Sequence, residues 1–397
     1  MKNTVLLFIA FTINLGFFIG CAQTDNVDKI AAPDTVESID DRENEEMGRT
    51  EEDDNEDMQE ITPKDFVMDM GAGWNLGNAM DTEDEDETAW GNPLTTKAMI
   101  DEIAKKGFKT LRLPVTWRFH MGSAPDYVIE KEWLDKVEAI ANFALDNDMY
   151  VILNIHHDEA WIIPTYEKAP AVKEQLTKVW KQIAHRFKSY NEHLIFETLN
   201  EPRHEDTPEE WNGGTAEGRD AVNQYHQVSL DAIRATGGNN ATRKIMVSTY
   251  AASTSQNALD AYAVPNNDEN VIVSVHSYFP YLFALEGSDP TWGTEADKSE
   301  LTQELNKIYE KFEKEGRAVV MGEWGSTFSG NPEDRLAHAE FYANGCVERG
   351  ICPVWWDNGN LDEFAIFNRN TLEWNYPEIA DAIVNAVKDR NSMEQTE

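Results

Sequence analysis

The chain has 397 residues, of which 41% are hydrophobic, so it can bury a sizeable core in one large α/β domain or two ordinary ones. Its formal net charge of -39 argues against a nucleic-acid partner, because phosphate binding needs Lys and Arg clusters that the sequence lacks. A neutral ligand fits better, and the twelve Trp and twelve Tyr residues suit one because their flat rings stack on apolar faces.

The first 20 residues have the pattern of a signal peptide. Lys2 precedes an apolar run that is short for a membrane span, and Gly20 stands directly before Cys21. A small residue before a cysteine resembles the signal of bacterial lipoproteins, in which Cys21 becomes the lipid-bearing first residue. Phe18 stands where such signals usually have Leu, which leaves ordinary secretion as the alternative. We therefore expect a monomeric, exported protein anchored by lipid to a bacterial outer membrane, or otherwise secreted.

An acidic segment follows the signal peptide. Residues 22–60 contain 16 Asp and Glu against three Lys and Arg and have few large apolar side chains. Such a composition cannot offset the entropy lost on ordering, so we expect a disordered linker over residues 21–60. A single folded domain is expected over residues 61–390, with a disordered tail over 391–397.

The remainder of the chain alternates strand-like and helix-like segments. The short apolar runs that we expect to be strands cover residues 72–78, 110–115, 150–157, 194–201, 244–250, 271–278, 318–325 and 353–359. Stretches between them, such as "TTKAMIDEIAKKGF", have apolar residues three and four apart, as in helices. Eight such units predict a (β/α)8 barrel. A doubly wound open sheet is the alternative, but "GAGWNLGN" fails the last position of the dinucleotide-binding motif.

The cysteines do not form a recognisable pattern. Three are too few for a disulfide scaffold and lack the spacing of a metal site. Cys346 and Cys352 could pair in an oxidising compartment, but we expect two core thiols.

Polar residues gather where the expected strands end, which is where a (β/α)8 barrel carries its reactive groups. These residues are Arg112, Asn154, His156, His157, Asp158, Asn200, Glu201, His276, Tyr278, Glu323, Trp355, Trp356, Asp357 and Asn358. Strand alternation would place Glu197, Leu199 and Glu201 on one face and would make His156 and His157 diverge. The pattern therefore does not favour a metal site, and we expect neither a metal nor a cofactor.

Two glutamates end strands that cannot be neighbours in a sequential barrel. Glu201 follows the fourth run and Glu323 the seventh, so their side chains could face each other across the barrel mouth. Two opposed carboxylates can cleave a glycosidic bond if one keeps its proton and the other stays ionised. Arg112 would favour the ionised form of Glu323, and Glu201 would keep its proton more easily. A lone strand-end Glu is more often a solvated charge, and only the convergence of groups on one rim favours catalysis.

With these residues identified, the chain resembles glycoside hydrolase family 5 of the cellulase-type clan, and in particular its subfamily 4. The motifs that carry the resemblance are "GWNLGNAMD", "AWGNPLTT", "GFKTLRLPVTWRFH", "VILNIHHDEAW", "IFETLNEPR", "VHSYFP", "MGEWGS" and "VWWDNG". They occur in this order and span the whole expected barrel, from about residue 66 to 376.

The resemblance implies a role for each matching residue. Glu201, in the Asn-Glu-Pro motif, would be the acid/base, and Glu323, in "GEWG", the nucleophile of a retaining mechanism. The implied supporting residues are Arg112 and Tyr278, which hold the nucleophile, Asn200, which contacts the sugar 2-hydroxyl, and His156 and His276, which line the same subsite. Trp356 would be the aromatic floor under that sugar, although the doublet with Trp355 leaves the choice open. Looser matches in the cleft, taken as substrate-binding candidates, are Asn75, Trp90, His120 and His157.

The sequence thus predicts an endo-β-1,4-glucanase that needs no cofactor and acts on cellulose chains, mixed-linkage glucan or xyloglucan by double displacement. A β-mannanase or xylanase of the same clan is the alternative within the enzyme class. From another class, the alternative is a non-catalytic glycan-binding surface lipoprotein, which would have no need to keep both glutamates.

Overall fold

The computed structural model describes residues 61–394, with side chains as far as residue 388. The expected signal peptide (1–20), the lipid-bearing Cys21 and the acidic linker (21–60) lie outside the described residues. Among residues 61–394, no helix combines the length and the apolar character that crossing a membrane requires.

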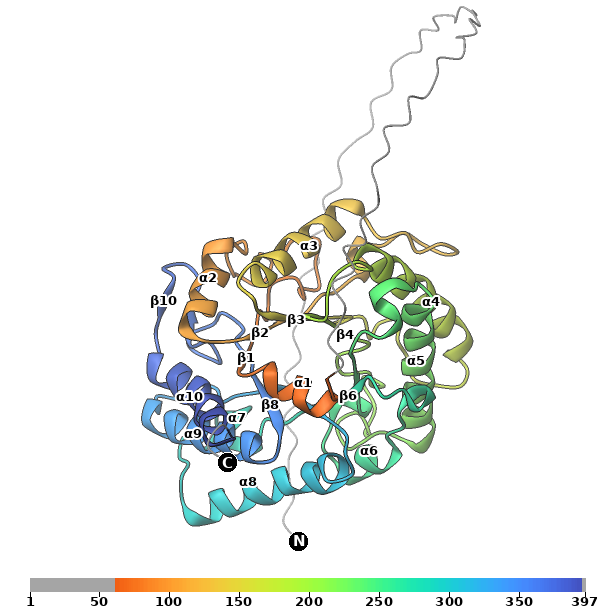
Figure 1. Cartoon of the computed structure of the whole chain (residues 1–397). Helices are drawn as coiled ribbons and strands as arrows, with labels where there is room; N and C mark the ends of the chain where they lie inside the picture. The colour runs from red at the N-terminus through yellow and green to blue at the C-terminus, as the bar shows by residue number, and fades with distance from the viewer. Residues whose placement is uncertain (1–60, 395–397) are drawn as a thin grey trace, which may run out of the picture. The chain divides into compact units, whose positions relative to one another are not determined.

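Eight parallel strands close into a barrel in chain order, with β8 hydrogen-bonded to β1 (Figure 1). The strands are β1 (Gly73–Asn75), β2 (Thr110–Leu113), β3 (Tyr150–Asn154), β4 (Leu194–Glu197), β5 (Ile245–Ser248), β6 (Val271–His276), β7 (Val319–Trp324) and β8 (Ile351–Trp355). All eight expected strands and the (β/α)8 architecture are confirmed. The strands end before the expected runs do, because the polar residues that follow leave the hydrogen-bonded ladder and turn into the rim.

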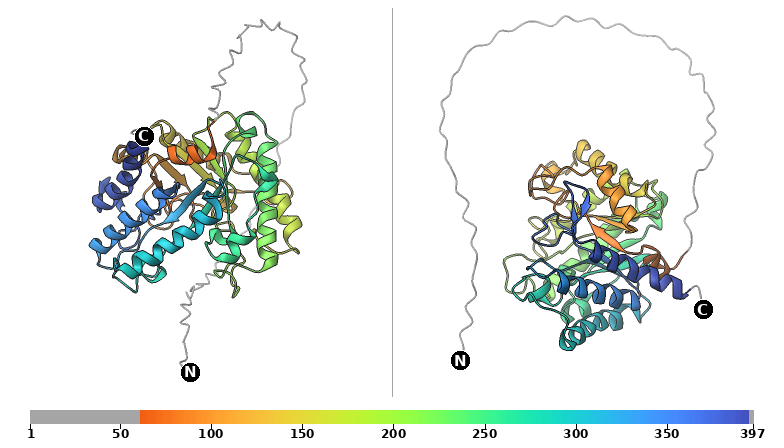
Figure 2. Two further views of the ribbon diagram at one scale, coloured as in Figure 1. Left: turned by 60° about the horizontal axis from the view of Figure 1, so that its bottom comes forward. Right: turned by 90° about the vertical axis from the view of Figure 1, so that its left-hand side faces the viewer.

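Helices surround the barrel and cover its outer face (Figure 2). They are α1 (Pro63–Asp69), α2 (Lys97–Lys106), α3 (Lys131–Leu145), α4 (Ala169–Arg186), α5 (Ala216–Arg234), α6 (Gln256–Ala261), α7 (Tyr281–Ala284), α8 (Glu295–Ile308), α9 (Pro332–Glu348) and α10 (Pro377–Glu394). A small antiparallel pair, β9 (Phe367–Asn368) and β10 (Glu373–Trp374), precedes α10. Helix α10 extends to Glu394, so the domain boundary expected at residue 390 falls inside it. Sequence patterns mark helix ends only weakly.

Local signals fix several helix boundaries. The hydroxyl of Thr96 caps α2 by accepting from the Met99 N–H, and Gly107 ends that helix in the left-handed region with φ 113°. A reciprocal capping box joins Thr294 and Asp297 at the start of α8.

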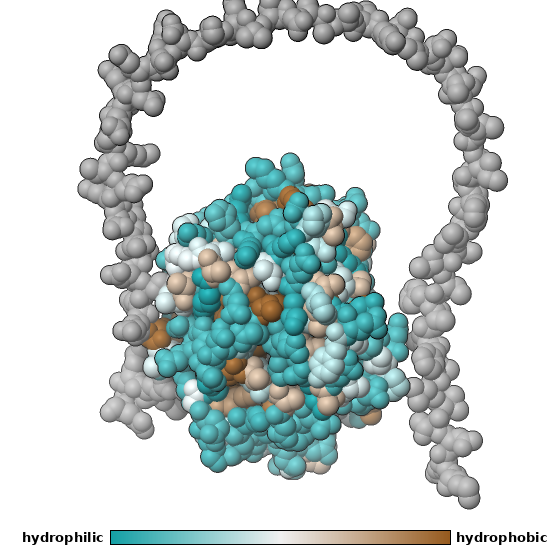
Figure 3. All heavy atoms as spheres, turned by 90° about the vertical axis from the view of Figure 1, so that its right-hand side faces the viewer, coloured by the Kyte–Doolittle hydropathy of each residue, from teal (hydrophilic) through white to brown (hydrophobic). Residues whose placement is uncertain are grey.

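The solvent-facing side of the layer around α4 and α5 is mainly hydrophilic, as Figure 3 shows.

The apolar core has two layers separated by the strands. Residues that point outward, such as Phe196, pack against the helices, whereas residues that point inward, such as Ile195, fill the barrel. Helix α1 lies across one end of the barrel (Figure 1) and adds Phe66, Val67 and Met70 to the inner layer. The reactive rim is at the other end, so α1 closes the base of the barrel on which that rim is built.

The two cysteines of the described domain are free thiols on opposite sides of β8. Cys346 belongs to the outer layer and Cys352 to the inner layer. Burial raises the pKa of both thiols, so they stay protonated and apolar in character. The expectation of two core thiols is confirmed.

Replacing Phe66 with Ala tests the closing role of α1. Phe66 is buried and meets Tyr150 edge to face, with ring centroids 5.2 Å apart. We expect Phe66→Ala to lower the free energy of unfolding by about 3 to 5 kcal/mol, measured by urea denaturation. The exposed Val128 provides the control, because Val128→Ala should change it by less than about 0.5 kcal/mol. Equal effects of the two substitutions would contradict the role of α1.

Candidate active site

A cavity of about 770 Å³ opens at the carboxyl ends of the strands. It is lined by His156, His157, Asn200, Glu201, Trp211, Ala251, Ser253, Thr254, His276, Ser277, Tyr278, Phe279, Tyr281, Leu285, Glu304, Glu323, Trp356 and Phe364. The loops after β3 to β6 supply most of this lining, and the segment after β8 supplies Trp356 and Phe364. The cavity therefore has the shape of a cleft between two groups of loops, with both glutamates in it.

Beneath the cavity lies the fully buried guanidinium of Arg112 on β2. Its Nη1 donates to Oε1 of Glu323 at 2.7 Å and to the side-chain oxygen of Asn75 at 3.0 Å. Its Nη2 donates to the side-chain oxygen of Asn200 at 2.7 Å and contacts Oε2 of Glu197 at 2.7 Å, and its Nε donates to the same Oε2 at 2.9 Å. All five N–H groups of the side chain are thus engaged, which fixes both its position and the groups that it holds.

An irregularity between β6 and β7 aims Glu323 into the cavity. Val275 pairs with Met321 but His276 pairs with Glu323, so Gly322 is the extra residue of a bulge. A Cβ at Gly322 would lie 3.0 Å from Nε2 of His276, so a glycine leaves room for that imidazole. The hydroxyl of Tyr278 donates to Oε2 of Glu323 at 2.9 Å. Glu323 is thereby held by Arg112 on one oxygen and by Tyr278 on the other.

The second glutamate, Glu201, is coupled to His276. Nδ1 of His276 lies 2.8 Å from Oε1 of Glu201 and 3.7 Å from Oε2 of Glu323. One oxygen of each glutamate lies within 4.8 Å of the other and of the imidazole. The two carboxylates therefore face each other across the cavity, as the sequence predicts.

The protonation of this pair differs from the sequence-based expectation. Burial raises the pKa of Glu201, but the hydrogen bond and charge of His276 outweigh it, and the net pKa is lowered. Burial lowers the pKa of His276, and the charges of Glu323 and Glu201 more than reverse this. Both shifts favour the proton on Nδ1 of His276 rather than on Glu201. The expectation that Glu201 keeps its proton through an apolar setting is wrong, because it did not include His276 as a bonding partner.

The structure decides between the two tryptophans of "VWWDNG". Trp355 is fully buried and meets Trp324 edge to face, whereas Trp356 lines the cavity. The Trp356 ring is parallel to that of His156, with a centroid separation of 5.9 Å. Gly77 makes room for it, since a Cβ there would lie 2.7 Å from the indole. Trp356, which directly follows the end of β8 at Trp355, is therefore the available aromatic platform.

The expectation that His156 and His157 diverge is wrong. Their ring centroids are 4.4 Å apart, and both imidazoles have a nitrogen within 4.8 Å of an oxygen of Asp81. Strand β3 ends at Asn154, so strand alternation no longer applies to the two histidines. Both carboxylate oxygens of Asp81 accept backbone N–H groups, from Asn78 and Ala79, which accounts for its burial.

The remaining substrate-binding candidates lie in different surroundings. Asn75 is fully buried and joins Arg112 to backbone carbonyls of β7 and β8, so it does not line the cavity. His120 is also buried and stacks on Trp133 at 3.5 Å, away from the cavity lining. Trp90 is 41% exposed, and its ring lies 5.8 Å from that of His157, which does line the cavity. Of these four candidates, His157 lines the cavity, and Trp90 lies beside it without being part of the lining.

Two residues were not among the predicted site residues. Glu197 is the second carboxylate partner of Arg112, and a charged residue inside an apolar strand was the signal for it. Trp211 lines the cavity, and its ring stacks 4.6 Å from the guanidinium of Arg203. It lies in the long loop after β4, which no sequence pattern places at the rim. The sequence predicts that Glu197, Leu199 and Glu201 share one strand face. Leu199 instead packs in the outer core layer, because β4 ends at Glu197 and strand alternation does not continue beyond it.

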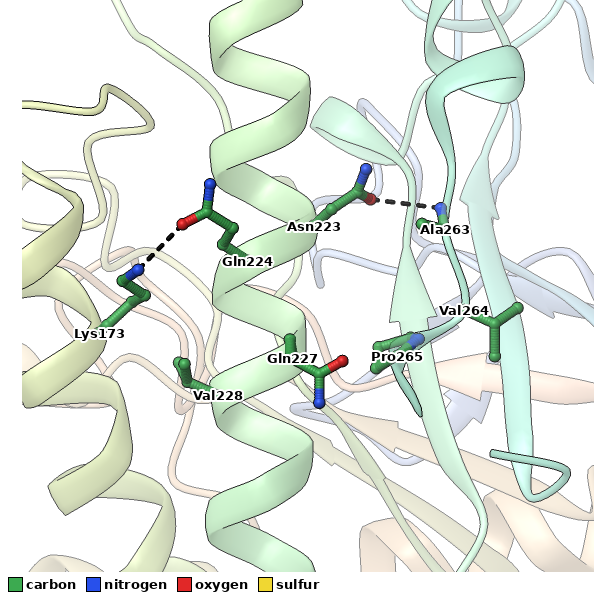
Figure 4. Close-up of a pocket in the computed structure, with 8 residues that line it drawn as sticks. All are labelled: Lys173, Asn223, Gln224, Gln227, Val228, Ala263, Val264 and Pro265. Atoms are coloured by element: carbon green, nitrogen blue, oxygen red, sulfur yellow. Dashed lines mark hydrogen bonds between the residues drawn. The ribbon is translucent and has the colours of Figure 1, made fainter. Parts of the chain in front are cut away.

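A second hollow, of about 320 Å³, lies on the outer face beside α5 (Figure 4). Lys173 reaches across from α4 to Gln224, and Asn223 accepts from the backbone N–H of Ala263. These side chains are thus occupied with one another, and the lining includes no carboxylate or imidazole. The chemistry therefore belongs to the cavity at the strand ends.

Comparison with known proteins identifies relatives of this arrangement. The model of the cellulase family (glycosyl hydrolase family 5) matches residues 74–362. Endoglucanase B of Clostridium cellulovorans is 50% identical over 336 residues, covering 82% of this chain and 76% of that protein. The solved structure of ZgEngAGH5_4 in complex with a cellotriose is 79% identical, with a TM-score of 0.82, and covers 82% of this chain and 99% of that one. The GH5-4 broad specificity endoglucanase from Clostridium acetobutylicum is 51% identical, with a TM-score of 0.81, covering 82% and 100%.

The charge on His157 should make stability depend on pH. Burial lowers its pKa, but the carboxylates of Glu159, 3.8 Å away, and of Asp81 and Glu201 raise it to about 9. A raised folded-state pKa stabilises fully below the ordinary value of 6.5, and this contribution is lost as the pH rises through about 9. The Tm of wild type should therefore fall more between pH 6.5 and 9.5 than that of His157→Gln.

Differential scanning calorimetry across this range provides the measurement. The exposed His185 on α4 gives the matched control, because His185→Gln should follow the wild-type decline. A His157→Gln curve that is parallel to wild type would show that no such linkage exists.

Proposed function

The chain belongs to glycosyl hydrolase family 5, and we propose that it is a retaining endo-β-1,4-glucanase with Glu323 as nucleophile and Glu201 as acid/base. The observation that carries the proposal is the pair of carboxylates, one oxygen of each within 4.8 Å of the other, in one open cleft. A non-catalytic glycan-binding protein would need the aromatic side chains of this cleft but not an ionised glutamate held against a second one.

In the first step, a carboxylate oxygen of Glu323 attacks the anomeric carbon while the bond to the leaving sugar breaks. Glu201 takes up the proton of Nδ1 of His276 along the 2.8 Å hydrogen bond and passes it to the leaving oxygen. A neutral glycosyl ester forms, Glu201 ends as an anion and His276 as a neutral imidazole, so charge balances. Arg112 and Tyr278 keep Glu323 oriented during the attack.

In the second step, the anion of Glu201 removes a proton from a water molecule that attacks the same anomeric carbon. The ester bond breaks, Glu323 returns as a carboxylate, and the proton returns to the pair of Glu201 and His276. Two inversions at one carbon retain its configuration.

The shape of the cleft supports a polymeric substrate. Trp356 offers a flat platform in the cavity lining, and Trp211 and Tyr281, both more than half exposed, add further aromatic surface to it. Sugars of a β-1,4-linked chain present apolar faces that stack on such rings. The two solved relatives reported above, one with a cellotriose bound and one described as of broad specificity, support β-glucan as the substrate class. We propose cellulose chains, mixed-linkage glucan and xyloglucan.

We also propose that the enzyme is a monomer that is exported and anchored through a lipid on Cys21. The export and the lipid anchor are supported by the N-terminal sequence alone, where Gly20 and Cys21 follow a charged residue and an apolar run.

Removal of either catalytic carboxylate should have a distinct consequence. Glu323→Gln should lower kcat on β-glucan by at least about 10⁴-fold, since no covalent intermediate can form. Azide added to Glu323→Ala should yield a glycosyl azide of inverted configuration, and azide added to Glu201→Ala one of retained configuration, both identified by NMR.

Glu304 provides the matched control, as a carboxylate that lines the same cavity and accepts from Thr254. Glu304→Gln should lose less than about tenfold in kcat. Near wild-type hydrolysis by Glu323→Gln would refute the nucleophile assignment, and azide products of the opposite configurations would reverse the two roles.

A product profile on carboxymethylcellulose, lichenan, xyloglucan, xylan and mannan tests the substrate class. We expect internal cleavage of the first three, seen as a rapid fall in viscosity before reducing ends accumulate, because an open cleft admits the middle of a chain. Preferential cleavage of mannan or xylan would instead identify a mannanase or a xylanase, and binding of all five without cleavage would identify a glycan-binding protein.

A further inference from the structure

We propose that Glu197 is a positioning residue for Glu323. It is buried and does not line the cavity, and it acts by sharing the positive charge of Arg112 and fixing the orientation of that guanidinium. This inference rests on the proposed function, because it assigns to Glu197 an effect on the nucleophile of that reaction. It concerns a residue that touches neither substrate nor reacting atoms and acts only through the guanidinium.

Glu197 accepts hydrogen bonds from three side chains, which is more than an ion pair with Arg112 alone would provide. Its carboxylate is fully buried on β4. Oε2 accepts from Arg112 at two nitrogens and from Asn154 at 2.9 Å, and Oε1 accepts from the hydroxyl of Ser274 at 2.7 Å. Four strands therefore supply the group: β4 bears it, and β2, β3 and β6 each contribute a donor.

The arrangement divides the guanidinium into two edges. Glu197 occupies Nε and one N–H of Nη2, which leaves Nη1 for Glu323 and Asn75 and the other N–H of Nη2 for Asn200. Because the guanidinium is planar and rigid, its contacts to Glu197 and to Glu323 can change only together. The carboxylate on the far edge thus fixes the geometry on the near edge.

Glu197 also changes the charge that Glu323 experiences. A buried cation paired with one anion alone would hold that anion strongly in its ionised form and weaken it as a nucleophile. With Glu197 and Glu323 both paired to Arg112, its positive charge is shared between two anions. The other charged groups that face Glu323 are His276 at 3.7 Å and Glu201, and His156 approaches the network through Asn154 at 3.1 Å.

The substitution Glu197→Gln separates charge from shape. The amide oxygen can replace Oε2 towards Arg112 and Asn154, and the amide NH₂ then faces Ser274, whose hydroxyl can rotate to accept. The number of hydrogen bonds is thereby kept while one negative charge is removed. We therefore expect the variant to fold.

The experiment compares wild type, Glu197→Gln and Ser274→Ala with 2,4-dinitrophenyl β-cellobioside as substrate. In Glu197→Gln, kcat/KM should fall by on the order of tenfold, and the acidic limb of its pH profile should move about one pH unit lower. The rate of deglycosylation, measured as kcat where this step limits, should not fall, since a less basic carboxylate leaves more easily. Ser274→Ala removes a hydrogen-bond donor from Glu197, which leaves more of the negative charge of that carboxylate to oppose Arg112. The acidic limb of its pH profile should therefore move slightly to higher pH.

Glu313 supplies the control for burial of a carboxylate, because it is nearly fully buried and pairs with Lys64 of α1 at 2.7 Å, at the opposite end of the barrel. Glu313→Gln should lower Tm without moving the pH profile. If Glu197→Gln behaves in this way too, Glu197 is merely structural and the inference is wrong. If Glu197→Gln does not fold, an unmoved profile in Ser274→Ala overturns the inference. Failure of wild type to hydrolyse the cellobioside would instead count against the proposed function.

Discussion

The reactive end of this barrel depends on one buried cation. Arg112 has no exposed surface, and a buried guanidinium is tolerated only when its charge and its donors are matched. Here all five N–H groups are engaged by two carboxylates and two side-chain amides. The carboxylates are Glu197 of β4 and Glu323 of β7, and the amides are Asn75 of β1 and Asn200 in the loop after β4. The requirement to satisfy this one side chain thus brings separate strands into a single register.

From this cation the site extends outward in order. Glu323 is held by Arg112 below and Tyr278 beside it, and the bulge at Gly322 gives it the direction that regular pairing would not. His276, seated over the same glycine, then reaches Glu201 on the opposite side. A proton on His276 is favoured by the two carboxylates around it. Glu201 and Glu323 are therefore not independent groups, since the imidazole between them responds to the charge of both.

The two ends of the barrel have different roles. Apolar residues of the inner layer, closed below by α1, make the base of the barrel, whereas polar residues such as Arg112, Glu197 and Glu323 gather towards the carboxyl ends of the strands. Because Glu323 and His276 stand within the paired strands β7 and β6, their positions are set by backbone hydrogen bonds rather than by flexible loops. The long loop after β4, which carries Trp211, instead shapes the wall of the cleft and so can influence which glycan fits without altering the reaction.

The sequence by itself determined the eight strands, the two glutamates and most of their partners, because apolar periodicity and strand-end position are local properties of the chain. Trp356 rather than Trp355, the contact between His156 and His157, and the inward role of Glu197 depended on where each strand stops, which local patterns mark poorly. The protonation of Glu201 was decided only by the tertiary structure. Its neighbour His276 is 75 residues away along the chain, and a pKa reflects the charges that surround a group in space.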